Sequence, residues 1–145
     1  MQEKATKTLQ KYWGFESFRP DQENVVSSIL AKNDTLALLP TGGGKSICYQ
    51  VPGVLLEGVT IVISPLIALM NDQIEGLKKG GISAIAISSN MSFKELIIAL
   101  ENAVYGKYKF LYVSPERVAS DLFQQKLKDM NVSFFAIDEA HCISE

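Results

Sequence analysis

The sequence has few of the residues that define disulfide-rich, metal-binding or membrane proteins. Its 145 residues include two cysteines, Cys48 and Cys142, which cannot form a disulfide framework and are expected to be reduced thiols. With the single histidine, His141, they also make a poor metal-binding set. No apolar run approaches the roughly 20 residues of a membrane span, and residues 1–7 lead into no signal-peptide core. We therefore expect a cytoplasmic protein without membrane association.

Positive charge is also scarce. The chain has 14 lysines and arginines against 16 acidic residues, a net charge of −2, and its two arginines are Arg19 and Arg117. This balance excludes nucleic-acid binding that is driven by a broad basic face, so any such contact must come from local groups. An apolar content of 47% and a charged content of 21% predict an ordinary soluble globular fold.

Apolar runs alternate with helical patterns along the chain. This alternation predicts an α/β fold in which a parallel sheet of about five strands has helices on both faces. We expect a helical segment over 1–34 and a phosphate-loop core over 35–145. The predicted strands cover residues 35–39, 59–63, 82–87, 110–113 and 132–137, and the predicted helices cover 6–13, 20–32, 47–56, 66–79, 92–105 and 116–128.

Several details of these helices follow from capping and spacing. Gly14 is suited to end the first helix, and Ser17 is the expected cap region of the second. Pro52 should disturb the third helix, and Ser92 should cap the helix over 92–105. In that helix four apolar side chains at helical spacing are expected to face inward: Phe93, Leu96, Ile97 and Leu100.

A glycine run follows the first predicted strand and indicates a phosphate-binding loop. Consecutive glycines let backbone N–H groups converge on an anion, and the helix that follows directs its positive end at the same place. Lys45 would reach the β- and γ-phosphates, and the Ser46 hydroxyl would hold Mg²⁺. Leu39 stands where the full pattern has its first glycine. The residues of this loop are Thr41, Gly42, Gly43, Gly44, Lys45 and Ser46.

Two carboxylates follow the last predicted strand. Asp138 is placed to bind the Mg²⁺ that Ser46 holds, and Glu139 to orient or polarise the attacking water. An acidic pair after a strand is common, but together with a phosphate loop it predicts a nucleoside triphosphate site. ATP and Mg²⁺ are the expected ligands.

The string Asp138-Glu139-Ala140-His141 matches the DEAH form of helicase motif II. With it, the chain resembles the first RecA-like motor domain of a RecQ-family DNA helicase of superfamily 2, a P-loop NTPase. The resemblance spans nearly the whole chain in the family's order. The matching stretches are residues 15–22 (motif 0), 41–46 (motif I), 63–73 (motif Ia), 113–117 (motif Ib) and 138–144 (motif II).

The resemblance implies roles for particular residues. Gln22 would hydrogen-bond adenine N6 and N7, Arg19 would support that pocket, and Phe15 would stack on the base, where many relatives have tyrosine. His141 would link nucleotide state to strand separation. Motifs Ia and Ib imply contacts to single-stranded DNA, although ordinary helix caps are the alternative. The DNA-contacting candidates are Ser64, Pro65, Asn71, Gln73, Ser114 and Arg117.

The implied function is a motor of an ATP-dependent 3′–5′ DNA helicase in repair and recombination, acting on single strands and duplex junctions. Family members continue past motif II with a second RecA-like domain that carries an arginine finger, so we expect a fragment that hydrolyses ATP poorly and unwinds nothing. The alternatives are an RNA helicase of the DEAD-box group, a small-molecule kinase and a non-catalytic nucleotide-binding module. With two arginines in the chain, an arginine-rich kinase lid is disfavoured.

Overall fold

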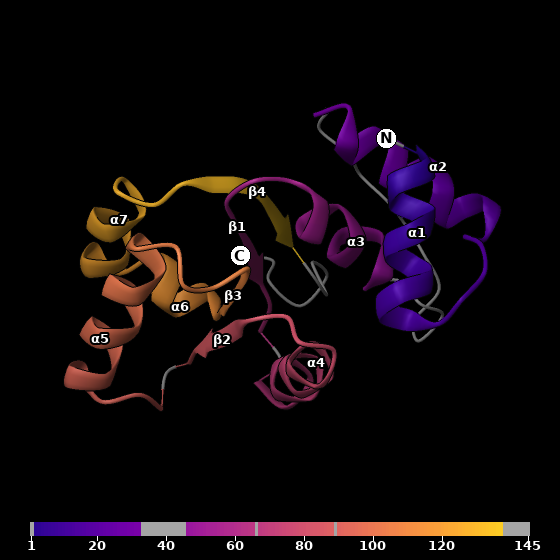
Figure 1. Cartoon of the computed structure of the whole chain (residues 1–145). Coiled ribbons are helices and arrows are strands. Elements are labelled where there is room, and N and C mark those ends of the chain that lie inside the picture. The colour runs from indigo at the N-terminus through magenta and orange to yellow at the C-terminus, as the bar shows by residue number, and fades with distance from the viewer. Residues whose placement is uncertain (1, 33–45, 66, 89, 138–145) are drawn as a thin grey trace. The chain divides into compact units, whose positions relative to one another are not determined.

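The computed structural model describes residues 2–32, 46–65, 67–88 and 90–137 (Figure 1). It forms two compact units, Met1–Leu56 and Glu57–Glu145, each with an apolar core of its own. The expected division of the chain at residue 34 remains a prediction. Among the described residues, no helix has the length and apolar content that crossing a bilayer requires.

The first unit contains three helices: α1 (Gln2–Trp13), α2 (Pro20–Leu30) and α3 (Ile47–Leu55). Gly14 ends α1 as predicted, with a φ of 77° and its N–H bonded to the carbonyls of Leu9 and Gln10. The α3 helix continues through Pro52 to Leu55. The core of this unit consists of Ala5, Leu9, Phe18, Val26, Ile47 and Val51.

The start of α2 differs from the expectation. The cap residue is Arg19, not Ser17, and its extended backbone has φ −69° and ψ 155°. The backbone N–H of Arg19 donates to the side-chain oxygen of Gln22 at 3.0 Å, so a side chain of the first turn caps the helix. Pro20 at the first helical position then fixes a φ that suits a helix. The prediction failed because a glutamine three residues into the helix replaced the serine as the capping group.

The second unit is a four-stranded sheet with helices between its strands. The strand order is β2-β3-β1-β4, and all three pairings are parallel. The α/β class and the parallel sheet are therefore confirmed, with four strands; the strand expected at 35–39 lies outside the described residues. The elements are β1 (Val59–Ile63), α4 (Ile67–Lys79), β2 (Ala84–Ile87), α5 (Phe93–Val104), β3 (Phe110–Val113), α6 (Pro115–Val118), α7 (Asp121–Leu127) and β4 (Val132–Ile137).

The direction of each crossover decides which face its helix covers. From β1 the chain moves across the sheet to β2, whereas from β2 to β3 and from β3 to β4 it returns in the opposite direction. Because parallel crossovers are right-handed, α4 covers one face and α5 and α7 cover the other. Buried side chains of α5 and α7 accordingly share one core with Ile61, Leu111 and Val113. In Figure 1, α5 and α7 lie beside each other, away from α4.

Two predictions for the helices on this sheet are wrong. Phe93 does not face inward and is 69% exposed, although Leu96 and Leu100 of the same stripe are buried. The single helix expected over 116–128 is two helices, because Ser120 begins a new one. Its hydroxyl donates to the Arg117 carbonyl at 2.7 Å and accepts from the Phe123 N–H at 3.3 Å, local bonds that compete with a continuous helix.

Candidate functional site

Most of the predicted phosphate site lies outside the described residues. This holds for Thr41, Gly42, Gly43, Gly44 and Lys45 of the loop, and for Asp138, Glu139 and His141.

Ser46 is the described member of the phosphate loop, and it occupies the cap position of α3 with a φ of −66°. Its carbonyl accepts the N–H groups of Tyr49 and Gln50, but its hydroxyl makes no capping bond to the helix. A serine hydroxyl at a helix start, not used as a cap, is chemically suited to bind Mg²⁺. The lysine, serine and aspartate of the two motifs together supply the donor types that a magnesium-bound triphosphate requires.

The three residues proposed for adenine recognition lie around the start of α2. Phe15 is 55% exposed, so its ring is accessible for stacking, whereas Gln22 is buried. The Gln22 side-chain oxygen already accepts the Arg19 N–H at 3.0 Å. This bond holds the amide in one orientation. Phe18, between these residues in the sequence, is buried in the core and anchors the segment.

Cys48 lies two residues after Ser46 but is not suited to nucleophilic chemistry. The thiol is buried, and burial followed by the negative charge of Asp21 raises its pKa to about 11. It is therefore protonated at neutral pH. Among the described residues no group of three histidine, cysteine or acidic side chains could hold a metal ion.

Ser64 and Ser114 lie where β1 and β3 end, at one edge of the sheet. The Ser64 N–H donates to the Val113 carbonyl at 3.1 Å, and the Ser114 N–H to the Ile87 carbonyl at 3.3 Å. These bonds align the ends of three strands. Both serine side chains are 2% exposed, and the Ser114 hydroxyl caps α6 by accepting the Arg117 N–H. Neighbouring Pro65 is half-buried. The structure thus brings the first residues of motifs Ia and Ib together.

The two candidates on α4 differ in their surroundings. Asn71 is exposed, whereas the Gln73 side-chain oxygen accepts the Tyr112 hydroxyl at 2.8 Å. Tyr112 is 1% exposed within β3, so this bond ties α4 to the sheet. The sequence reasoning missed Tyr112, although a tyrosine in an otherwise apolar strand is a signal that its hydroxyl needs a partner.

Arg117 is held by the protein through its side chain. Its Nε donates to the Ser88 carbonyl and its Nη2 to the Met91 carbonyl, both at 3.0 Å. Ser88 and Met91 lie between β2 and α5. Neither acceptor could be found from the sequence, because no local spacing relates residue 117 to residues 88 and 91.

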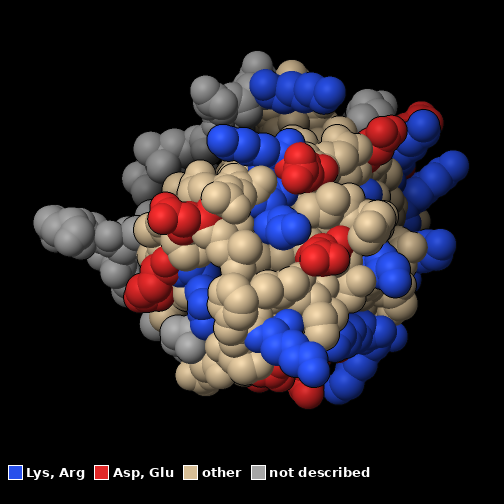
Figure 2. Space-filling view, turned by 90° about the vertical axis from the view of Figure 1, so that its left-hand side faces the viewer, with Lys and Arg blue, Asp and Glu red and all other residues tan. Residues whose placement is uncertain are grey.

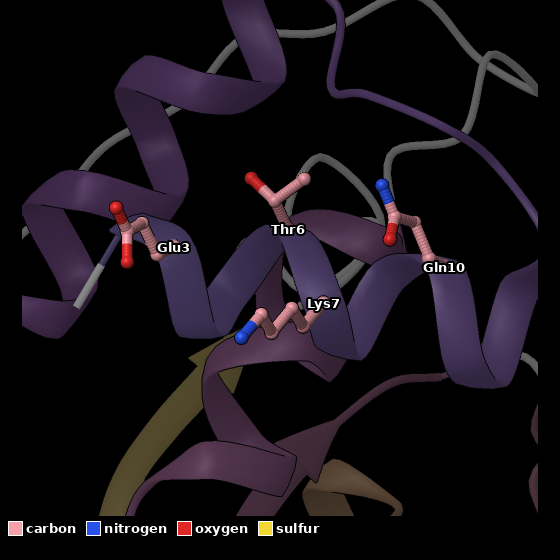
Figure 3. Close-up of a pocket in the computed structure, with 4 residues that line it drawn as sticks. All are labelled: Glu3, Thr6, Lys7 and Gln10. Carbon is pink, nitrogen blue, oxygen red and sulfur yellow. The ribbon is translucent and has the colours of Figure 1, made fainter.

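Two surface features of the described residues bear on further ligand sites. On the face drawn in Figure 2, lysine and arginine side chains are interspersed with aspartate and glutamate. Figure 3 shows a hollow whose four lining residues, Glu3, Thr6, Lys7 and Gln10, all belong to α1. Because these side chains come from one face of one helix, they do not converge on a common point as catalytic groups do.

The model of the DEAD/DEAH box helicase family matches residues 19–145. The chain belongs to the DEAD/DEAH box helicase family. It is also 48% identical to the "Probable ATP-dependent DNA helicase RecS" of Bacillus subtilis over 98% of its length, and 45% identical to the "ATP-dependent DNA helicase RecQ" of the same organism over 100%. The predicted resemblance to RecQ helicases is confirmed. The chain covers 28% and 25% of these two relatives.

Solved structures support the fold. The crystal structure of helicase MrfA bound to DNA and AMPPNP has a TM-score of 0.75 at 20% identity, covering 98% of this chain and 21% of the other. A hypothetical ATP-dependent RNA helicase from Sulfolobus tokodaii has a TM-score of 0.74 at 21% identity, covering 99% and 43%. The DEAD/DEAH family chain therefore has the architecture of helicase domains.

Proposed function

We propose that this chain is the nucleotide-binding part of an ATP-dependent 3′–5′ DNA helicase that acts in DNA repair and recombination. The observation that carries the proposal is the high identity to two proteins named as ATP-dependent DNA helicases, over nearly the whole chain. The helicase MrfA, whose fold is similar, was crystallised with both DNA and AMPPNP. A cytoplasmic location is part of the same proposal.

The nucleotide would be bound by residues of motifs 0, I and II. Phe15, Arg19 and Gln22 would hold the adenine, and the exposed ring of Phe15 supports that role. Lys45 would neutralise charge on the phosphates, while Ser46 and Asp138 would hold Mg²⁺, which supplies further positive charge at the phosphate oxygens.

Two further roles are proposed for residues of motif II: to position the attacking water and to link hydrolysis to strand separation. Glu139 would orient the attacking water, since a carboxylate within hydrogen-bond reach can accept its proton. His141 would connect this site to the parts that separate strands.

DNA would be bound at the sheet edge where β1 and β3 end. Single strands and duplex junctions are the proposed substrates. The net charge of −2 favours local donors over a basic face. Asn71 is exposed and available for direct contact. Ser64 and Ser114 have buried side chains, so they and Pro65 would contribute through the backbone that they position.

We further propose that the 145-residue chain alone hydrolyses ATP slowly and requires a second RecA-like domain as a partner. An arginine finger accelerates phosphoryl transfer by roughly 10³- to 10⁵-fold. Of the two arginines in the sequence, Arg117 donates to two backbone carbonyls and Arg19 belongs to the adenine segment. Both arginines therefore have other proposed roles, which supports assigning the finger to a second domain.

The test is steady-state ATPase activity of the 145-residue chain and of the full-length protein, with and without single-stranded DNA. We expect DNA-stimulated turnover in the full-length protein and its loss in Lys45→Ala and Glu139→Gln. Stimulation by single-stranded RNA alone would replace the DNA assignment with an RNA one. Full activity of Glu139→Gln would remove Glu139 from its role, and ordinary helicase rates in the 145-residue chain would contradict the need for a partner domain.

A further inference from the structure

The side chain of Arg117 joins two parts of the sheet edge that are distant in sequence. Its Nε and Nη2 atoms donate to the carbonyls of Ser88 and Met91, each at 3.0 Å. Those carbonyls follow β2, whereas Arg117 belongs to α6, which follows β3. The guanidinium therefore links the polypeptide after one strand to the helix after the next strand.

The backbone of Arg117 is also hydrogen-bonded to neighbouring residues. Its N–H donates to the Ser114 hydroxyl at 3.4 Å, and its carbonyl accepts the Ser120 hydroxyl at 2.7 Å. Ser114 is in turn bonded to β2 through the Ile87 carbonyl. Hydrogen bonds of Arg117 and its neighbours thus connect the residues after β2 with the start of α7.

We propose that Arg117 is a positioning residue for DNA binding, one that fixes the sheet edge around Ser114 rather than contacting a phosphate. This inference rests on the proposed DNA-binding function. A planar guanidinium can donate to two carbonyls in a fixed geometry, whereas a lysine ammonium is a single point charge on a flexible stem. Replacement of Arg117 by lysine keeps the positive charge but loses the planar group that donates to two carbonyls. It should therefore impair a positioning role but preserve a phosphate contact.

The experiment measures binding of fluorescently labelled oligo(dT) by the full-length protein at several salt concentrations. The variants are Arg117→Lys and Arg117→Ala, and Lys94→Ala is the matched control because it removes a positive charge from an exposed site. If Arg117 positions the edge, both Arg117 variants weaken binding by about tenfold, the effect of losing one or two hydrogen bonds. The slope of log K against log salt stays unchanged, and the KM for ATP stays at the wild-type value.

The opposite result identifies a phosphate contact. In that case Arg117→Lys binds as wild type does, and Arg117→Ala reduces the salt slope by about one unit. Wild-type affinity in both variants would equally overturn the inference.

A second measurement separates failure of this inference from failure of the proposed function. Hydrogen exchange of the Met91 and Arg117 amides, without DNA, should be faster in both Arg117 variants than in wild type and in Lys94→Ala. If the wild-type protein binds no oligo(dT), the DNA-binding function fails and the inference falls with it, whatever the exchange rates. If wild type binds DNA but exchange is unchanged in the variants, the positioning role alone is wrong.

Discussion

Strands β3 and β4 are similar in composition but differ in their surroundings. Every residue of β3 is buried, and Phe110 is 0% exposed. In β4, Phe135 and Ile137 are 52% and 60% exposed. The strand β3 lies between β2 and β1, whereas β4 pairs with β1 alone among the described strands. The comparison teaches that an apolar run identifies a strand, but its place in the sheet decides how much that strand contributes to the core.

The largest expected effect compares one phenylalanine from each strand. Phe110→Ala should lower the free energy of unfolding by about 3–5 kcal/mol, because it leaves a cavity in place of a fully buried ring. Phe135→Ala should cost about 1 kcal/mol or less, since half of that ring is already in water. Urea denaturation of the two variants measures both values. Equal losses would show that β4 is as well packed as β3.

The next effect concerns how closely β4 approaches β1. A Cβ at Gly58, which precedes β1, would lie 2.5 Å from the Asn131 carbonyl oxygen, and Gly58 has a φ of 99°. Gly58→Ala should therefore lose about 2–5 kcal/mol from strain and overpacking together. Gly81→Ala is the control, because Gly81 has a φ of 84° but nothing near its Cβ; it should lose about 1–2 kcal/mol. If Gly58→Ala loses no more unfolding free energy than Gly81→Ala, the close approach to Asn131 does not contribute to the effect.

A smaller effect tests the bond between β3 and its covering helix. Tyr112→Phe removes the hydroxyl that donates to Gln73, and it should cost about 1 kcal/mol. The exposed Tyr105 provides the control, since Tyr105→Phe should change the unfolding free energy by less than about 0.5 kcal/mol. Thermal unfolding of both variants measures these changes. An unchanged unfolding free energy in Tyr112→Phe would mean that this bond does not hold α4 to the sheet.

The smallest effect lies outside the strands and depends on pH. Hydrogen bonds from the Ser92 backbone N–H and then from its side chain lower the pKa of Glu95 below its ordinary value of 4.5. A carboxyl whose pKa is lower in the folded state stabilises the protein above the unfolded pKa, and this stabilisation is lost as pH falls through the folded value. Wild type should therefore exceed Glu95→Gln in stability at pH 7, with the difference disappearing at acidic pH. A difference that is constant with pH would exclude the charged form of Glu95 as its cause.

Local signals predicted much of the fold. Ser92 caps the start of α5 as expected, by accepting the Glu95 N–H at 3.1 Å, and Glu95 in turn accepts the Ser92 N–H at 2.9 Å. The β-branched run at 59–63 is the strand β1, buried through most of its length. These features could be predicted because each depends on residues that are adjacent in the sequence.

The errors arose where distant residues decide the outcome. Helical spacing placed Phe93 on the buried stripe of α5, but it is 69% exposed, because burial depends on neighbouring elements that local spacing does not specify. The hydrogen-bond partners of Gln73 and Arg117 come from other parts of the chain. The sequence alone therefore could not predict that these two side chains bond within the protein. The segment proposed to bind adenine, by contrast, is local, and two of its residues, Arg19 and Gln22, are joined by a hydrogen bond at the start of α2.

The measurement that tests the central claim most directly is a double-mutant cycle on the affinity of the protein for a fluorescent ATP analogue at saturating Mg²⁺. The variants are Lys45→Ala, Asp138→Ala and the double substitution. If the two motifs meet around one magnesium-bound triphosphate, Asp138→Ala weakens binding strongly in wild type and only slightly beside Lys45→Ala, a coupling of 1 kcal/mol or more on the usual scale of ~0.5–3 kcal/mol. Effects that add to within about 0.5 kcal/mol would show that the two residues act at separate places.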